Sequence, residues 1–151
     1  MSNHRIRPLA ICVFHRQGRI LVNEAVDQVK RQRFFRPLGG GIEFGEPAAT
    51  AAQREIREEL DAEIKGLQLL GMLENIFTYR GQPGHEIVFV YDGSFSDDSL
   101  YSMPYLAGRE SNGEPFKAYW RASESFSNDT PLYPVGLLEL LQSRGMLTGE
   151  A

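Results

Sequence analysis

The amino-acid sequence predicts an α+β fold in which helices sandwich a mixed β-sheet, an α/β/α arrangement. Two observations predict it. Segments with apolar alternation and β-branched residues recur along the chain, whereas one central and one terminal segment have the apolar period of a helix. Strands interrupted by such helices are typical of layered α+β domains. The 151 residues fit one domain spanning 1–151, large enough to bury a core without disulfides.

Three strands are expected before the central helix. Residues 7–14 and 19–23 are apolar and alternating, and the "RQG" at 16–18 is typical of a hairpin turn, so these two strands are predicted to pair antiparallel. Residues 33–38 are predicted to form a third short strand. The three glycines at 39–41 are expected to end it.

The central helix is predicted from position 47 to about 61. The "GEP" at 45–47 is a helix-start signal, because Pro47 suits the first helical position. At about 100° per residue, apolar side chains share one stripe that must face the sheet. These side chains are Ala49, Ala52, Ile56 and Leu60.

The C-terminal half is expected to contain a long hairpin, a short strand and a closing helix. Residues 64–79 and 85–95 alternate and flank "GQPG" at 81–84, which has turn chemistry. After a polar loop, residues 116–120 are predicted as a strand. An amphipathic helix is expected in "PVGLLELLQSR" from Pro134.

Composition excludes several classes of protein. No apolar run reaches the roughly 20 residues of a membrane span, and the N-terminal apolar run is too short for a signal peptide, so no membrane association and a cytoplasmic location are expected. The net charge of −4 and the pI of about 5.4 argue against a protein that coats nucleic acid. The single Cys12 lies in an apolar run and is interpreted as a buried, inert thiol.

The segment "REIREEL" at 54–60 contains an unusual concentration of carboxylates. Glu55, Glu58 and Glu59 lie on one helix face, where like charges three or four residues apart destabilise a helix by a few tenths of a kcal/mol each. One interpretation is a solvated face held by salt bridges to its arginines. The other is a divalent-metal site, since Mg²⁺ and Mn²⁺ prefer oxygen ligands and this spacing presents several to one point.

The preceding "GGGIEFGE" favours the metal site, because glycines let the backbone approach a ligand closely. Gly40, Glu46, Arg54 and the three helix glutamates have the spacing G-x5-E-x7-R-E-U-x-E-E, with the aliphatic Ile56 at U. This pattern resembles the Nudix box, the signature of the Nudix hydrolase family, over residues 40–62. The resemblance ends at Asp61 and Ala62, where the family pattern has glycine and a bulky aliphatic residue.

The resemblance implies a Nudix-type α/β/α sandwich and hydrolysis of the pyrophosphate bond in a nucleoside diphosphate derivative. It implies Mg²⁺, or Mn²⁺, held by Glu55, Glu58, Glu59 and the carbonyl of Gly39 or Gly40. Arg54 would orient carboxylates rather than touch the substrate. The chemistry agrees, because cations neutralise a pyrophosphate and lower the pKa of the attacking water.

The general base is expected among Glu55, Glu110 and Glu114. Glu114 is favoured because a mobile loop before the 116–120 strand could fold over the helix; the alternative is an ordinary polar loop residue.

Arg36, Glu43 and Tyr79 are candidate substrate contacts. Arg36 ends the basic "KRQRFFR" segment at 30–36, which could steer phosphates, although those cations could equally decorate a solvated strand. Tyr79 lies seventeen residues after Ala62, near the place where some Nudix subfamilies have a substrate-linked tyrosine or proline. The tyrosine argues weakly against ADP-ribose as substrate.

Three functions therefore remain open. The first is a metal-dependent pyrophosphohydrolase acting on a small nucleotide, alone or as a homodimer. The second is a Nudix-fold module that binds a nucleotide without cleaving it. The third is an RNA 5′-end pyrophosphohydrolase, which the basic segment could support but which the acidic pI and the lack of a further basic patch or aromatic platform oppose.

Overall fold

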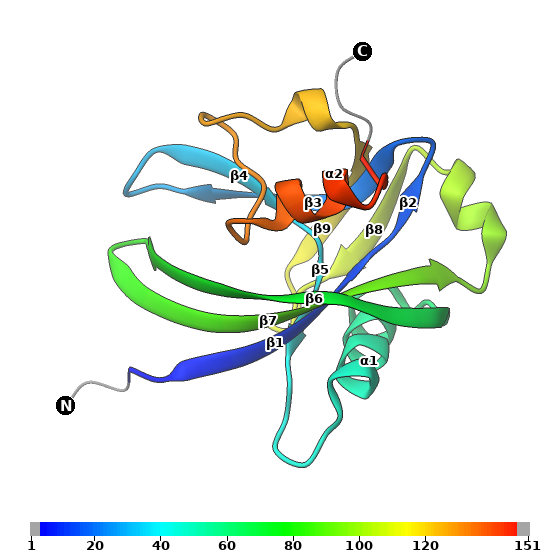
Figure 1. The fold of residues 1–151 in the computed structure, drawn as a ribbon, viewed down its shortest axis with the longest axis horizontal. Helices are drawn as coiled ribbons and strands as arrows, with labels where there is room; N and C mark the ends of the chain where they lie inside the picture. Colours follow the sequence, from blue (N-terminus) through cyan, green and yellow to red (C-terminus); the bar gives the residue numbers. More distant parts are fainter. Residues whose placement is uncertain (1–3, 148–151) are drawn as a thin grey trace.

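The computed structural model describes residues 4–147, which form two β-sheets and two α-helices (Figure 1). The mixed sheet has the strand order β5, β1, β7 and β6, and the second sheet is antiparallel, with β2, β3, β9 and β8 in order and β4 also paired to β3. The mixed sheet consists of β1 (Ile6–Val13), β5 (Leu38–Gly41), β6 (Ile64–Tyr79) and β7 (Gln82–Phe95). The second sheet consists of β2 (His15–Arg16), β3 (Arg19–Asp27), β4 (Gln32–Arg36), β8 (Tyr105–Arg109) and β9 (Pro115–Arg121). The α-helices are α1 (Ala48–Leu60) and α2 (Leu137–Ser143).

Helices cover both faces of the mixed sheet, as the sequence predicted. In Figure 1, α2 lies above strands β6, β7 and β1, and α1 lies below them. Successive β1 side chains point to opposite faces. Val13 packs in one core cluster with Leu137 of α2, and Cys12 packs in another with Ile56 of α1. The predicted α/β/α arrangement around a mixed sheet is therefore confirmed.

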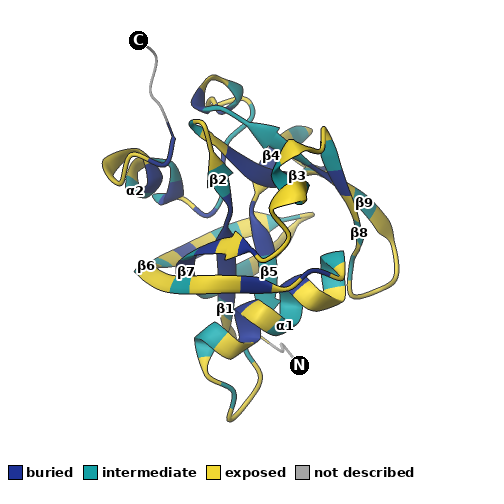
Figure 2. Ribbon diagram, turned by 90° about the vertical axis from the view of Figure 1, so that its right-hand side faces the viewer, coloured by how far each residue is buried: buried dark blue, intermediate teal, exposed yellow. Residues whose placement is uncertain are grey.

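The predicted pairing of the first two strands is wrong. Only the two residues of β2 pair with β3 across the Gln17–Gly18 turn, whereas β1 pairs parallel with β7 and antiparallel with β5. The reason is burial, because residues 10–14 are all buried (Figure 2). A strand covered on both faces reads as a continuous apolar run, and such strands occupy sheet centres rather than the edge of a hairpin.

The glycines at 39–41 do not end a strand, contrary to the prediction. The strand predicted at 33–38 stops at Arg36, and residues Leu38–Gly41 form β5 against β1. A Cβ at Gly39 would lie 2.2 Å from the Ala10 carbonyl oxygen, and Gly39 has a φ of +147°. Glycine is needed because the neighbouring strand backbone comes this close.

The predicted polar loop after the long hairpin contains strand β8 and a 3₁₀ helix at Asp98–Ser102. Strand β8 forms the edge of the second sheet and pairs only with β9 among the described strands. Its five residues include Gly108, which lowers the local strand signal. Pairing with β9 creates this strand, so local pattern did not reveal it.

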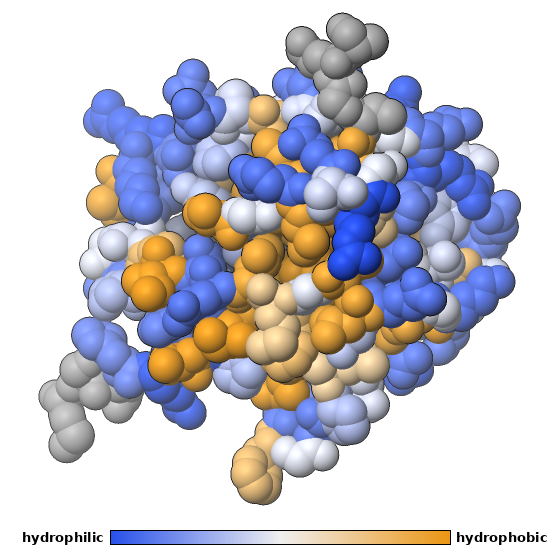
Figure 3. All heavy atoms as spheres, in the orientation of Figure 1, coloured by the Kyte–Doolittle hydropathy of each residue, from blue (hydrophilic) through white to orange (hydrophobic). Residues whose placement is uncertain are grey.

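The long hairpin is confirmed as β6 and β7, with its turn slightly earlier than predicted. Arg80 and Gly81, both with positive φ, make the turn, and Pro83 already pairs with Thr78. Figure 3 shows apolar atoms gathered in the middle of the face that β6 occupies in Figure 1. Within residues 4–147, neither helix is long and apolar enough to cross a membrane.

Helix α1 ends at the first position where the sequence departs from the family pattern. Asp61 adopts φ 53° and ψ 41°, the left-handed conformation that glycine favours, and its backbone N–H donates to the Arg57 carbonyl. Ala62 is 8% exposed and packs in the α1 core cluster. The helix therefore terminates in the usual geometry without the glycine.

Replacing Asp61 tests this termination. We expect Asp61→Gly to leave the free energy of unfolding unchanged or raise it by up to about 1 kcal/mol, because glycine relieves the left-handed strain but costs chain entropy. Asp61→Val should lower it by about 1–2 kcal/mol, since a β-branched side chain opposes this conformation. Urea unfolding measures both, and a Val variant as stable as the parent would contradict the assignment.

Candidate active site

Arg54 on α1 holds together the segment that precedes the helix. Its guanidinium donates two hydrogen bonds to the Glu46 carboxylate, Nε at 2.8 Å and Nη2 at 2.9 Å, and Nη2 also donates to the Gly41 carbonyl at 2.9 Å. Its Nη1 donates to Glu55 at 2.9 Å. The planar, five-donor guanidinium suits such a fork, which a lysine could not reproduce.

The helix glutamates predicted as ligands lie around this fork at different depths. Glu55 is largely buried, with its side chain 15% exposed, and Glu58 is 57% exposed and lies 3.4 Å from Arg54 Nη1. The Glu59 carboxylate points the other way and accepts a hydrogen bond from the Gly39 N–H at 3.2 Å. The helix spacing therefore brings Glu55 and Glu59 to the edge of β5. Glu58 instead stays on the exposed side of the helix, beside Arg54.

Burial and repulsion set the protonation of this cluster. Burial, together with the charges of Glu55 and Glu110, raises the pKa of Glu59 to about 8. Burial also raises the pKa of Glu55, although the Arg54 hydrogen bond opposes the rise. In contrast, the Arg54 fork and the Glu43 backbone N–H lower the pKa of Glu46 to about 2. Arg54 thus neutralises charge on the Glu46 and Glu55 side of the cluster, whereas Glu59 on the other side accepts from a neutral backbone N–H.

The β5 glycines leave room for these carboxylates. A Cβ at Gly40 would lie 2.5 Å from the Glu55 carboxyl carbon and from its Oε2. Any side chain there would displace Glu55 toward Arg54 or out of the cluster. Gly40 is the first residue of the motif, and the structure shows a steric reason for glycine at that position.

Two cavities meet at this point. One of about 510 Å³ lies between the sheets and is lined by aromatic side chains at its far end; the other, of about 650 Å³, lies over β5 and the start of β1. Both are lined by Glu59, Glu110 and the Gly39–Gly40 backbone. Arg7 also lines both, 3.7 Å from Glu86. The cavity between the sheets falls within the usual 300–1,000 Å³ of small-molecule sites. Its aromatic lining consists of Phe34, Phe77, Tyr79 and Tyr133.

Among the loop acids, the structure brings Glu110 and not Glu114 to the cluster. Glu110 follows β8, accepts a hydrogen bond from Asn23 Nδ2 at 3.1 Å and lies 4.0 Å from Arg36 Nη2. Glu114 is exposed and lines neither cavity. The loop between β8 and β9 runs 110–114, and the Glu110 N–H donates to the Glu114 carbonyl across it. That turn places its first residue, rather than its last, over the helix.

The predicted substrate contacts line separate cavities. Arg36 and Tyr79 line the one between the sheets, and the Tyr79 ring meets Phe34 edge-on at 5.8 Å between centroids. Glu43 is 72% exposed, lies 3.9 Å from Arg54 and lines the cavity over β5. Sequence reasoning missed Asn23, which is 7% exposed in β3 and holds Glu110. A polar residue in an apolar strand was the available signal.

The donors at this site fit a hard divalent cation in kind, because they are all carboxylate or backbone oxygens. Within residues 4–147, no three acidic, histidine or cysteine side chains already converge in ligand geometry. The reason is that Glu55 and Glu58 face Arg54 while Glu59 faces Gly39. Ligation of one cation by all three therefore requires their carboxylates to turn from these partners.

Comparison with known proteins identifies the family. The NUDIX domain model matches residues 4–124, so the chain belongs to the NUDIX family, and the resemblance of its motif is confirmed. The fold is shared with a MutT NUDIX hydrolase from Burkholderia pseudomallei, at a TM-score of 0.63 and 23% identity over 92% of this chain and 98% of that one. A NUDIX hydrolase from Nitrosomonas europaea is similar at a TM-score of 0.55 and 14% identity, over 96% of this chain and 82% of that one. The E. coli ORF135 protein is similar at a TM-score of 0.53 and 19% identity, over 95% of this chain and 93% of that one.

The raised pKa of Glu59 predicts how the metal-free protein responds to pH. Between the ordinary glutamate value of 4.5 and about 8, the folded state holds a proton that the unfolded chain has lost. The free energy of unfolding should therefore fall as pH rises through this window. Glu59→Gln should flatten that fall. Urea unfolding in EDTA at several pH values measures this free energy. If parent and variant showed the same dependence on pH, the raised pKa of the buried Glu59 would be contradicted.

Proposed function

We propose that this protein is a metal-dependent hydrolase that cleaves the pyrophosphate bond of a small nucleoside diphosphate derivative. The observation that carries the proposal is the junction of the two cavities at Glu59, Glu110 and the Gly39–Gly40 backbone. One cavity offers aromatic surface for a base, and the other is lined by carboxylates suited to a cation–phosphate complex. The sugar that connects the base to the phosphates of such a substrate would lie at the junction.

In this proposal Glu55, Glu58, Glu59 and the Gly39 carbonyl hold Mg²⁺, with Mn²⁺ as a substitute. The cation supplies neutralisation of the phosphate charge and a lowered pKa for the attacking water. Without a cation, burial and next the negative charges of Glu55 and Glu110 disfavour the ionised Glu59 carboxylate and raise its pKa. A protein that kept this charge for stability alone would not bury it beside other carboxylates.

Arg54 acts as a positioning residue. Because its fork is occupied by Glu46, the Gly41 carbonyl and Glu55, it has no free donor directed at a phosphate. It orients the Glu55 carboxylate and holds the 41–46 segment against the helix. The substrate phosphates would instead meet Arg7, which lines both cavities, and Arg36, which lies 4.0 Å from Glu110 at the junction.

Glu110 is our candidate for the general base, in place of the Glu114 expected from the sequence. Asn23 orients one Glu110 oxygen, and the side chain lines both cavities at the junction. From there it can accept a proton from a water that attacks phosphorus, while the bond from phosphorus to the bridging oxygen breaks. Asn23 would fix this carboxylate as Arg54 fixes Glu55.

The proposal retains the remaining sequence expectations. The substrate is a small soluble nucleotide and the location is the cytoplasm. Every carboxylate of the motif is present, which favours an enzyme over a binding module. A homodimer stays a prediction; Leu69, Met72 and Ile76 on β6 expose the apolar surface that such an assembly could use.

Replacing one exposed ligand tests the metal site. Glu58→Gln should lower kcat by about two to four orders of magnitude without changing the fold, because it removes one anionic ligand from a half-exposed position. The matched control is Glu63→Gln, since Glu63 is also an exposed glutamate paired to an arginine, Arg57. Steady-state kinetics at saturating Mg²⁺ measure both, and near-parental turnover in Glu58→Gln would remove Glu58 from the ligand set.

A substrate panel separates the enzyme from a binding module. With Mg²⁺, we expect release of a nucleoside monophosphate from at least one diphosphate-linked nucleotide, and no release in EDTA. The panel should include nucleoside triphosphates, dinucleoside polyphosphates, nucleotide sugars and ADP-ribose, with products separated by chromatography. Tight binding of a nucleotide without turnover of any member would favour the module instead.

A further inference from the structure

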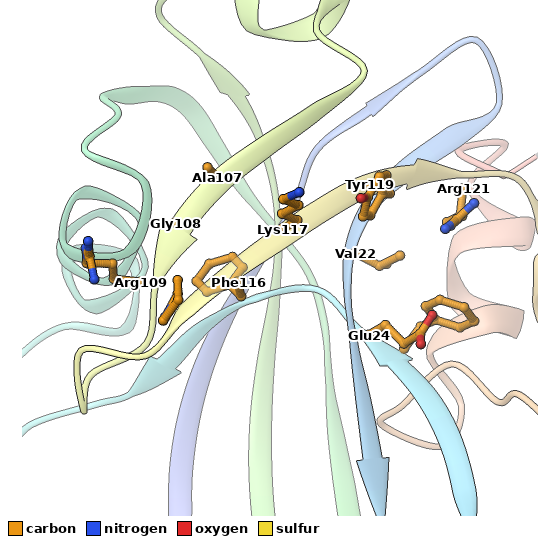
Figure 4. Close-up of a pocket in the computed structure, with 11 residues that line it drawn as sticks. Val22, Glu24, Ala107, Gly108, Arg109, Phe116, Lys117, Tyr119 and Arg121 are labelled. Atoms are coloured by element: carbon orange, nitrogen blue, oxygen red, sulfur yellow. The ribbon is translucent and has the colours of Figure 1, made fainter.

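The outer face of the second sheet carries a cavity of about 650 Å³ that the proposed reaction does not use. Side chains at alternate positions of β8 and β9 share this face, because Tyr105 pairs with Tyr119 and Ala107 with Lys117. Val22 and Glu24 of β3 and Phe35 of β4 continue it. Figure 4 shows Lys117, Tyr119 and Arg121 in a row along β9, with Val22 and Glu24 beyond them.

Only half of this face is covered by the rest of the described chain. Val22 and Phe35 are 1% and 5% exposed, packed with Phe126 and the α2 residues. In contrast, Ala107 and Lys117 are exposed, and the two tyrosine side chains are partly exposed. Arg121 stands at the boundary between the covered and the open half.

The open half is rich in uncompensated positive charge. No described carboxylate lies within 4.0 Å of the charged groups of Arg109, Lys117 or Arg121, whereas the one acid of the lining, Glu24, is held bidentately by Arg33. The Nε of Arg121 is buried and, among residues 4–147, has no hydrogen-bond partner. A buried donor without an acceptor costs free energy, so the guanidinium gains when a ligand draws it into a rotamer that gives this N–H an acceptor.

The same side chains form an aromatic platform. The Tyr105 and Tyr119 rings lie 5.6 Å apart between centroids and are tilted by 43°. Lys117 Nζ lies 4.8 Å from the Tyr105 centroid, and the Arg121 guanidinium lies 5.1 Å from that of Tyr119. Each cation thus lies over one face of a ring, so that a base stacked on the opposite face and a phosphate held by the cation could belong to one nucleotide.

We propose that this platform binds single-stranded nucleic acid, with bases on Tyr105 and Tyr119 and phosphates on Lys117, Arg121 and Arg109. The cations are spread along the sheet rather than converging on one point; Lys117 and Arg121 alone are four strand residues apart, about 13 Å. Such spacing matches a run of phosphates better than a single phosphate group. An acidic peptide would satisfy the cations but would leave the rings without flat partners.

This platform removes one objection raised by the sequence. In the sequence, the lack of a second basic patch and of an aromatic platform counted against an RNA ligand. The structure contains both features. The sequence did not reveal them because β8 was expected to be a loop. The net charge of −4 still opposes long-range attraction. Binding at this face should therefore be local and of modest affinity.

Binding is tested by fluorescence anisotropy with a labelled single-stranded RNA of about ten nucleotides, within the usual site size of such surfaces. EDTA is present throughout, so that neither metal nor hydrolysis contributes and failure here leaves the proposed catalytic function untouched. Lys117→Glu should weaken binding at least tenfold. The matched control Lys65→Glu makes the same charge change at an exposed position on β6 and should weaken it less than threefold.

Two further measurements separate the contributions of base stacking and counterion release to RNA binding from that of the protein's net charge. Tyr105→Leu keeps apolar area but removes the ring, and we expect at least about fivefold weaker binding from lost base stacking. For three phosphate contacts, the logarithm of the binding constant should fall with the logarithm of salt concentration with a slope of about −2. Thermal unfolding of each variant confirms that the fold is retained.

Several results would overturn the proposal. Absence of RNA binding would do so, as would equal weakening by Lys65→Glu and Lys117→Glu, which would reduce the interaction to net charge. Displacement of the RNA by a nucleoside monophosphate at equal affinity would convert the platform into a mononucleotide site. Displacement by polyglutamate at equal affinity would make it a general anion site.

Discussion

The bidentate ion pair between Arg54 and Glu46 organises the end of the molecule that contains the candidate active site. It links the helix to the irregular segment before it, while a third hydrogen bond from the same guanidinium fixes the Gly41 carbonyl at the end of β5. Partly buried ion pairs gain little net stability, because desolvation offsets most of their attraction. Their value here is geometric, since one rigid planar group sets the relative positions of strand, loop and helix.

The geometry set by Arg54 explains why the remaining carboxylates lie close to one another in a partly buried place. The guanidinium binds Glu46 and one Glu55 oxygen and lies 3.4 Å from Glu58, whereas Glu59 accepts from the Gly39 N–H and lies near the charges of Glu55 and Glu110. Close approach is possible because Gly40 has no side chain where a Cβ would touch Glu55. The site is thus a compact negative centre beside an aromatic cavity, an arrangement that favours a cation and a phosphorylated ligand over either alone.

Strand pairing in the second sheet determines two features that the local sequence pattern does not predict: which loop acid reaches the cavities, and where the basic aromatic face lies. Glu110 and Glu114 are both polar residues of one short loop, and nothing in their neighbours along the chain separates them. Pairing of β8 with β9 turns Glu110 toward Asn23 and leaves Glu114 in solvent. The same pairing places Tyr105 beside Tyr119, fourteen residues away in sequence, and creates the basic aromatic face.

The sequence by itself determined the α+β class, the central helix, the long hairpin and the clustering of three glutamates at the helix edge. These depend on periodicity and spacing, which act over one or two turns or along one strand. Tertiary structure decided that β1 occupies the centre of a mixed sheet, that the three glycines belong to a strand, and that Glu110 rather than Glu114 lines the cavity junction. Each of these results depends on which distant segments pair, and the free energy of pairing comes from contacts that no local window contains.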